Sequence, residues 1–206
     1  MISKRIAVVD YKAGNLKSVE TSLKYLGADF FISKEPGKVL KADSLIIPGV
    51  GEARAAMENL KLAGLDTVIW EFYKTGKPVL GICIGIQLFF ENSTERNTKC
   101  LGLLKGKVIR FSDIKGLKVP HMGWNQVIPV KEDFLFSGIA PGSSFYFVHS
   151  YYPVPSMAEY ILAETDYGIK FTSAVAYENL RAVQFHPEKS GPVGLRLLSN
   201  FINRDF

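Results

Sequence analysis

The first half of the chain repeats one pattern of apolar and polar positions: a short β-branched run, then a stretch with apolar residues at helical spacing. Residues 5–10 form the first run, which is typical of a buried strand. A helix is expected after it, because Asn15 suits a helix N-cap and Gly27 stands where a C-terminal glycine ends helices. The apolar face of this helix consists of Leu16, Val19, Leu23 and Leu26.

The same unit recurs along the chain. Strands are predicted at Phe30–Ser33, at Ser44–Ile47 and at residues 78–82, and they are followed by a short helical stretch, a helix from Glu52 and a helix from Ile84. Strands that alternate with helices pair in parallel through right-handed crossovers, which places helices on both faces of the sheet. This half of the chain therefore predicts an α/β fold with a doubly wound, mostly parallel sheet.

From about Lys107 the pattern changes to alternating stretches rich in Tyr and Val. They are residues 107–111, 124–130, 144–151, 161–165, 173–177 and 181–185. Antiparallel hairpins fit this C-terminal half better than crossovers do. A closing helix is expected from Val193 to Phe206, with an apolar side made of Leu197, Leu198, Phe201 and Ile202. Because no repeat or Pro/Gly/Ser-rich linker marks a boundary, residues 1–206 are predicted to form one domain.

Composition excludes several classes of protein. The 206 residues are 47% hydrophobic and 22% charged, as in globular chains and unlike disordered, collagenous or coiled-coil sequences. Two cysteines are too few for a disulfide-stapled scaffold. The net charge of +5 is modest and the lysines and arginines are spread along the chain, so no nucleic-acid partner is expected.

Neither a membrane segment nor an export signal is predicted. The uncharged stretch before Asp10 is too short for the hydrophobic region of a signal peptide. The longest uncharged run, residues 134–158, contains Pro141, Pro153 and Pro155, which would leave backbone groups unsatisfied in lipid. The chain is therefore expected to be cytoplasmic.

Residues 81–85, Gly-Ile-Cys-Ile-Gly, lie directly after an apolar strand and directly before a helical stretch. This is the pattern of a nucleophile elbow with sulfur in place of oxygen: a tight turn strains its central residue, and flanking glycines avoid collisions with neighbouring backbone. Cys83 would stand at the carboxyl edge of the sheet, where a helix N-terminus favours the nucleophilic thiolate. The alternative interpretation of Cys83 is a small buried hydrophobe.

Residues 183–188 contain the groups that such a nucleophile needs. Pro187 restricts His186 to extended geometry, and residues two apart on a strand share a side, so His186 and Glu188 are expected to share a face. A carboxylate beside an imidazole takes the Nδ1 proton and leaves Nε2 to pair with a thiolate. Taken singly, His186 is also consistent with a structural histidine and Glu188 with a solvated charge. Because the chain has only three histidines, the combination with Cys83 favours a nucleophile, a base and an orienting group.

A third segment, residues 48–51 with the sequence Pro-Gly-Val-Gly, follows the strand predicted at Ser44–Ile47. Acyl transfer needs two N–H donors directed at the developing oxyanion. The amide of Ile84, next to the nucleophile, is one natural donor, and this glycine-flanked turn can supply the other from Val50 or Gly51. The competing interpretation is an ordinary turn between a strand and a helix.

In order and spacing, residues 48–51, 81–87 and 184–190 together resemble the class I, triad-type glutamine amidotransferases. Residues 10–16 and 120–125 further resemble the glutaminase subunits of imidazole glycerol phosphate synthases, which belong to histidine biosynthesis. The resemblance implies a single, flavodoxin-like glutamine amidotransferase domain.

The sequence departs from that family at two places near the cysteine. Ile84 and Ile86 stand where the family usually has Leu and Met, which changes packing but keeps the amide donor of Ile84.

The resemblance also implies a mechanism. Cys83 attacks the side-chain amide carbon of glutamine, and His186 first protonates the departing ammonia and then activates water against the thioester. Glu188 holds the imidazole ring throughout. The family match places four further residues against the substrate: Gln87, Glu95, Ser150 and Tyr151. From the residues alone, Gln87 is also consistent with a helix cap and Glu95 with a solvated loop.

Ammonia is useful only if it reaches an acceptor before it escapes, so a partner is expected. The resemblance names a cyclase subunit, a (β/α)₈ barrel that would form a heterodimer with this chain. It takes ammonia through a tunnel and produces imidazole glycerol phosphate and an aminoimidazole carboxamide ribotide. The motifs place Asn15, Trp124, Asn125 and Lys189 at the interface. A buried core position is the alternative for Trp124.

No cofactor or metal is expected, because the His and Cys positions lack the spacing of metal ligands. Cys100 has no His-Glu companion of its own and is interpreted as structural.

Three other functions compete with this interpretation. One is a related glutaminase that feeds a sugar-modifying synthase, with the same catalytic residues and another partner. Another is a stand-alone cysteine hydrolase of similar fold, and the third is a binding module that has kept the elbow shape. The presence of Cys83, His186 and Glu188 together argues against the third.

Overall fold

The computed structural model describes residues 4–12, 14–112 and 117–204. Its centre is an eight-stranded sheet in the order β2-β1-β3-β4-β14-β13-β12-β9. The strands from β2 to β14 in this order are parallel, and β13, β12 and β9 follow in antiparallel pairing. The strand bounds are β1 Ile6–Val9, β2 Phe30–Ser33, β3 Ser44–Ile47, β4 Val79–Ile82, β9 Ile128–Pro129, β12 Ile161–Asp166, β13 Lys170–Tyr177 and β14 Leu180–Val183.

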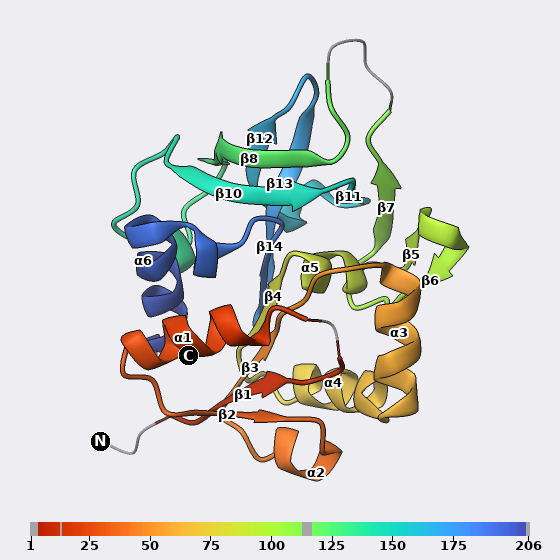
Figure 1. The fold of residues 1–206 in the computed structure, drawn as a ribbon, viewed down its shortest axis with the longest axis vertical. Helices are drawn as coiled ribbons and strands as arrows, with labels where there is room; N and C mark the ends of the chain where they lie inside the picture. Colours follow the sequence, from red (N-terminus) through yellow and green to blue (C-terminus); the bar gives the residue numbers. More distant parts are fainter. Residues whose placement is uncertain (1–3, 13, 113–116, 205–206) are drawn as a thin grey trace.

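Helices cover both faces of this sheet (Figure 1), so the predicted α/β fold is confirmed. Strand β1 shows why two layers are needed. Its residues Ala7 and Val9 pack with α2, α3, α4 and α5, whereas Ile6 and Val8 pack with α1 and α6. The helix bounds are α1 Leu16–Tyr25, α2 Pro36–Val39, α3 Ala53–Leu62, α4 Leu65–Lys74, α5 Ile84–Leu88 and α6 Gly191–Ile202.

Two smaller sheets stand beside the large one. Strands β8, His121–Gln126, and β10, Ser144–His149, form an antiparallel ribbon that crosses the upper part of the molecule in Figure 1. The other sheet has the order β11-β7-β5-β6. Its strands are β5 Asn92–Ser93, β6 Thr98–Lys99, β7 Gly106–Arg110 and β11 Tyr151–Pro155.

Several expected elements differ from the structure. The helix expected from Glu52 is two helices, because the chain turns at Gly64 with φ of +65° between α3 and α4. Strand β14 pairs antiparallel with β13 as expected, but it also pairs in parallel with β4 and so joins the two halves in one sheet. The closing helix ends at Ile202, and residues 205–206 lie outside the described part. None of the helices in the described residues is long and apolar enough to cross a membrane.

We predict that Gly85 is required by close packing between α5 and β3. A Cβ added at Gly85 would lie 2.3 Å from the carbonyl oxygen of Ile47, so Gly85→Ala must displace backbone. We expect this substitution to lower the free energy of unfolding by about 2 kcal/mol. The matched control is Gly37→Ala in α2, where an added Cβ meets no atom within 4 Å. Urea denaturation of both variants tests the prediction, and equal stabilities would contradict it.

Candidate active site

Cys83 occupies the turn between β4 and α5 in a strained conformation, with φ of 55° and ψ of −105°. Its N–H donates a 2.8 Å hydrogen bond to the carbonyl of Val183, which fixes the turn against β14. Neither flanking glycine has room for a side chain. A Cβ at Gly81 would come within 2.5 Å of the Phe89 ring, and one at Gly85 within 2.3 Å of the carbonyl oxygen of Ile47. This local geometry is the elbow that the sequence predicts, and it holds the sulfur at the carboxyl edge of the sheet.

His186 and Glu188 reach this edge because β14 runs parallel to β4, with Val183 opposite Ile82. The Nδ1 atom of His186 lies 2.7 Å from Oε1 of Glu188, and both side chains are fully buried. The predicted strand alternation is wrong here, because β14 ends at Val183 and residues Pro187–Lys189 form a 3₁₀ helix. The turn, rather than a shared strand face, brings imidazole and carboxylate together.

The electrostatics of His186 favour its charged form. Burial lowers its pKa, but the nearby Cys83 thiolate and the Glu188 carboxylate outweigh burial, so the pKa lies well above its ordinary value. Since Nδ1 is held by Glu188, Nε2 is the nitrogen available for proton exchange. This atom is buried and has no hydrogen-bond partner among the described residues. His186 can therefore act as an imidazolium beside the sulfur of Cys83, the arrangement that activates a nucleophilic cysteine.

Asn15 also belongs to this group. It occupies the N-cap position of α1, as predicted, but in a left-handed conformation and without a capping hydrogen bond from its side chain. Its Nδ2 atom donates instead to Oε1 of Glu188. The N-terminal segment of the chain therefore helps to fix the carboxylate that orients His186.

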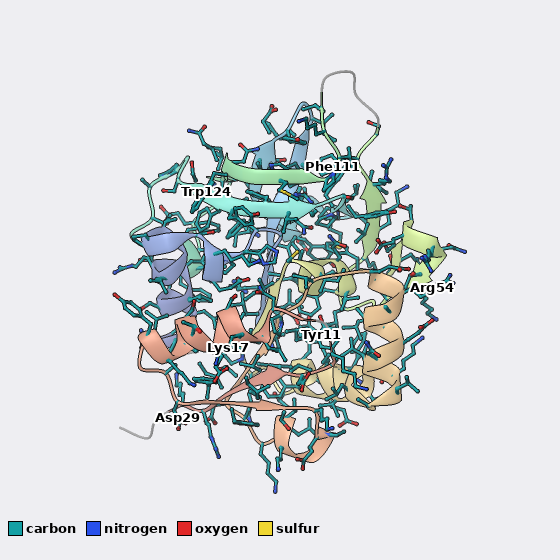
Figure 2. The ribbon with its side chains drawn as sticks, viewed as in Figure 1. Tyr11, Lys17, Asp29, Arg54, Phe111 and Trp124 are labelled. Atoms are coloured by element: carbon teal, nitrogen blue, oxygen red, sulfur yellow. The ribbon has the colours of Figure 1, made fainter. Side chains whose placement is uncertain are left out.

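The turn at residues 48–51 faces the cysteine, where Val50, Gly51 and Ile84 line the same cavity of about 250 Å³. Tyr11, which lies in the interior of the molecule in Figure 2, donates a 2.7 Å hydrogen bond from its hydroxyl to the carbonyl of Pro48. Burial raises the pKa of Tyr11, and the negative charge of Cys83 raises it further, so the phenol stays a donor. The turn is thus held beside the sulfur by a neutral buried hydroxyl.

The four residues expected at the substrate, Gln87, Glu95, Ser150 and Tyr151, all line this cavity. Gln87 is buried and donates to the backbone carbonyl of Tyr151 at 3.0 Å, so it does not cap its helix. Glu95 accepts a 2.6 Å hydrogen bond from the N–H of Ala53. Its pKa is raised, mainly by burial, so it does not behave as a freely solvated loop carboxylate.

The residues expected at the partner interface divide into two groups. Trp124 on β8 is 59% exposed, which excludes a core position, and Figure 2 places it on the β8–β10 ribbon. Lys189 is also exposed, with Nζ 6.0 Å above the ring of Tyr146. Asn125 instead turns inward and donates to the carbonyl of Asp166 at 2.8 Å, and Asn15 contacts Glu188 as described above.

The other thiol has different surroundings. Cys100 is buried, and its Sγ donates to the carbonyl of Thr98 at 3.7 Å. Its pKa is raised to about 11, chiefly by burial, which keeps it as an unreactive thiol at neutral pH. Within the described residues, no group of three or more His, Cys, Asp and Glu side chains could hold a metal ion.

Among the residues of the site without a role in the sequence-based interpretation are Tyr11, which supports the turn at residues 48–51, and Gln184. The side chain of Gln184 is fully buried, and its Nε2 lies 3.8 Å from Sγ of Cys83. A detectable signal existed for Gln184, because it is a polar residue between the apolar Val183 and Phe185 at the end of a buried strand.

Comparisons with known proteins identify the family of the chain. Residues 7–204 match the family model of class-I glutamine amidotransferases. The chain is 48% identical to the imidazole glycerol phosphate synthase subunit HisH of Dehalococcoides mccartyi strain CBDB1, over 95% of each chain. It is 46% identical to the subunit of the same name from Chromobacterium violaceum, over 98% of each chain.

Solved structures with much lower sequence identity share the fold. The PurLQS structure from Thermotoga maritima matches with a TM-score of 0.75 and 19% identity, over 98% of this chain and 99% of that one. A putative GMP synthase subunit from Thermoplasma acidophilum matches with a TM-score of 0.72 and 19% identity, over 98% of this chain and 94% of that one. With its family motifs, its fold and its close relatives in agreement, the chain belongs to the class-I glutamine amidotransferases.

Proposed function

We propose that this chain is the glutaminase subunit of an imidazole glycerol phosphate synthase, which hydrolyses glutamine and delivers ammonia to a partner subunit. The observation that carries the proposal is the strained Cys83 beside a buried His186 whose Nε2 is free and whose Nδ1 is held by Glu188. Relatives of 46–48% identity bear the name of this synthase, which favours it over a sugar-modifying synthase or a stand-alone hydrolase.

The reaction follows from the protonation states of the site. The Cys83 thiolate attacks the amide carbon of glutamine, and the His186 imidazolium gives its Nε2 proton to the nitrogen that leaves as ammonia. Neutral His186 then takes a proton from the water that hydrolyses the thioester and releases glutamate. Glu188, itself held by Asn15, keeps Nε2 directed at the reacting atoms in both steps.

The cavity supplies the remaining requirements of acyl transfer. The N–H of Ile84, together with that of Val50 or Gly51, stabilises the oxyanion of each tetrahedral intermediate. Glu95 is the carboxylate in the cavity wall and attracts the ammonium group of the substrate. Around it, Gln87, Ser150 and Tyr151 shape the pocket for one amino acid, consistent with a volume of about 250 Å³.

The partner in this proposal is the cyclase subunit, a (β/α)₈ barrel that takes the ammonia through a tunnel. An exposed apolar pair on β8, Met122 and Trp124, provides the centre of the docking surface, and the exposed Lys189 adds a positive charge near it. Asn125 supports this surface from the inner side of β8, and Asn15, at Glu188, completes the proposed set of interface residues.

We predict that Cys83→Ala abolishes glutamine hydrolysis, lowering its rate by at least about a thousandfold, because no other group can form the thioester. The complex with the cyclase should still make imidazole glycerol phosphate when ammonium salts replace glutamine, since the cyclase is unaltered. Assays of both activities on one preparation test this. Hydrolysis at the normal rate would show that Cys83 is not the nucleophile.

We also predict graded losses for the two residues that serve the nucleophile. Glu188→Gln keeps an oxygen that can accept from Nδ1 of His186, so kcat should fall about tenfold to a hundredfold. His186→Ala removes the acid and the base together, and kcat should fall by at least about a thousandfold. Steady-state kinetics of the activated complex measure both, and a larger loss for Glu188→Gln would contradict the assigned roles.

Trp124→Ala should weaken binding to the cyclase by about thirtyfold, or about 2 kcal/mol, because large exposed aromatics at interface centres dominate binding energy. Leu62→Ala is the matched control, since Leu62 is 87% exposed at the end of α3 and away from β8. Titration calorimetry with the cyclase distinguishes the two. Equal affinities for both variants would exclude Trp124 from the interface.

A further inference from the structure

Four buried polar side chains connect strand β8 with the sulfur of Cys83 without belonging to the triad. Exposed fractions are 2% for His121 on β8, 6% for His149 on β10, 4% for Gln87 on α5 and 0% for Gln184 after β14. Buried polar groups are costly unless hydrogen-bonded, so their partners reveal what they do. These four are joined in one continuous line of hydrogen bonds.

The carbonyl of Tyr151 fixes the direction of the hydrogen bond between the two histidines. Nδ1 of His149 lies 2.8 Å from this oxygen, which can only accept, so Nδ1 carries the proton. Burial lowers the pKa of His149 to about 3 and that of His121 to about 4, so both rings are neutral at pH 7. Nε2 of His149 must then accept, and Nδ1 of His121, 3.0 Å away, donates to it.

The line begins at Asn125 on β8. Its Nδ2 atom donates 2.8 Å to the carbonyl of Asp166, which settles the orientation of the amide. The same nitrogen lies 3.3 Å from Nε2 of His121, the one ring atom left to accept. Each hydrogen bond from Asn125 through His121 and His149 to the carbonyl of Tyr151 therefore has an assigned donor and acceptor.

The line continues from the same carbonyl to the sulfur. Nε2 of Gln87 donates to the oxygen of Tyr151 at 3.0 Å and to Oε1 of Gln184 at 3.1 Å. Because the amide oxygen of Gln184 is thereby turned towards Gln87, its nitrogen faces the nucleophile. Nε2 of Gln184 lies 3.8 Å from Sγ of Cys83, within hydrogen-bonding distance for sulfur.

A donor in this position has a chemical consequence. Hydrogen bonds to a charged acceptor are about twice as strong as neutral ones, and Gln184 is fully buried, where water cannot compete. The bond is strong to the thiolate and weak to the thioester, whose sulfur carries no charge. Gln184 thus acts on the charge state and rotamer of the free nucleophile.

We propose that Gln184 stabilises the reactive thiolate of Cys83 by donating a hydrogen bond from Nε2, and that His121 and His149 are positioning residues that hold Gln184 through the Tyr151 carbonyl and Gln87. The proposal rests on the proposed function in taking Cys83 as the nucleophile.

The test measures the thiolate directly, on the whole chain in a Cys100→Ala background, so that Cys83 is the one remaining thiol of the two in the sequence. Iodoacetamide alkylation is followed by intact mass as a function of pH. Gln184→Glu keeps an oxygen for Gln87 but places a carboxylate at the sulfur, and Gln184→Met removes the donor at similar volume. The titratable neighbours His186, Glu188 and Tyr11 remain in every variant.

We expect the pH of half-maximal alkylation to rise by about one unit in Gln184→Met, which is about tenfold less thiolate at neutral pH, and by more in Gln184→Glu. A smaller rise in the pH of half-maximal alkylation is expected for His149→Phe. This substitution keeps an aromatic ring but removes the hydrogen bonds to His121 and to the carbonyl of Tyr151. Phe171→Leu is the matched control, because Phe171 packs 5.2 Å from His149 without joining the line, and its profile should be unchanged.

The outcomes separate the possibilities. Gln184 variants with an unchanged alkylation profile overturn the thiolate role, and a His149→Phe profile equal to that of Phe171→Leu overturns the positioning role of the histidines. Alkylation requires neither glutamine nor a partner. If the Gln184 variants show the expected rise in the pH of half-maximal alkylation but the chain does not hydrolyse glutamine, the result would count against the proposed function alone.

Discussion

The chemistry of this protein depends on the parallel pairing of β14 with β4. Val183 stands opposite Ile82, and the N–H of Cys83 continues the pairing by donating to the carbonyl of Val183. These few bonds bring a turn from the first half of the chain against a segment close to its end. Without them the cysteine would have neither its base nor the donor of Gln184, whatever the local sequence around each residue.

Around this pairing, several polar groups of the site are held by backbone and side chains from distant segments. The main chain of His186 is fixed on both sides, since its N–H donates to Tyr146 at 2.9 Å and its carbonyl accepts from Ser190 Oγ at 2.6 Å. Tyr11 and Asn15 add support from the N-terminal segment. Two buried atoms of the triad have no partner among the described residues, Nε2 of His186 and Oε2 of Glu188. Leaving them unpaired is a cost to stability, and for Nε2 the proton exchange of the proposed mechanism explains it.

The sequence predicted what local rules control and missed what distant contacts decide. Strands β2 and β3 have the predicted bounds, and the elbow glycines were expected, because period and turn chemistry are local signals. Asn15 has a good N-cap sequence, yet Glu188, far along the chain, captures its side chain. The 3₁₀ helix after His186 and the parallel partner of β14 were missed for the same reason. The contact between the Gln184 amide and the sulfur of Cys83 could not be predicted either, because it depends on the pairing of β14 with β4.

Strand β8 connects the outside of the molecule with its centre through the ordinary alternation of a strand. Met122 and Trp124 point outward, while His121 and Asn125 point inward and begin the line of hydrogen bonds that ends at Cys83. A partner bound to the outer side of β8 would press on the strand that anchors this line. Neutral hydrogen bonds of assigned direction fix the side chains of the line relative to one another. In the proposed function, the two sides of β8 therefore serve different purposes: the outer side docks the partner, and the inner side anchors the hydrogen bonds that lead to the nucleophile.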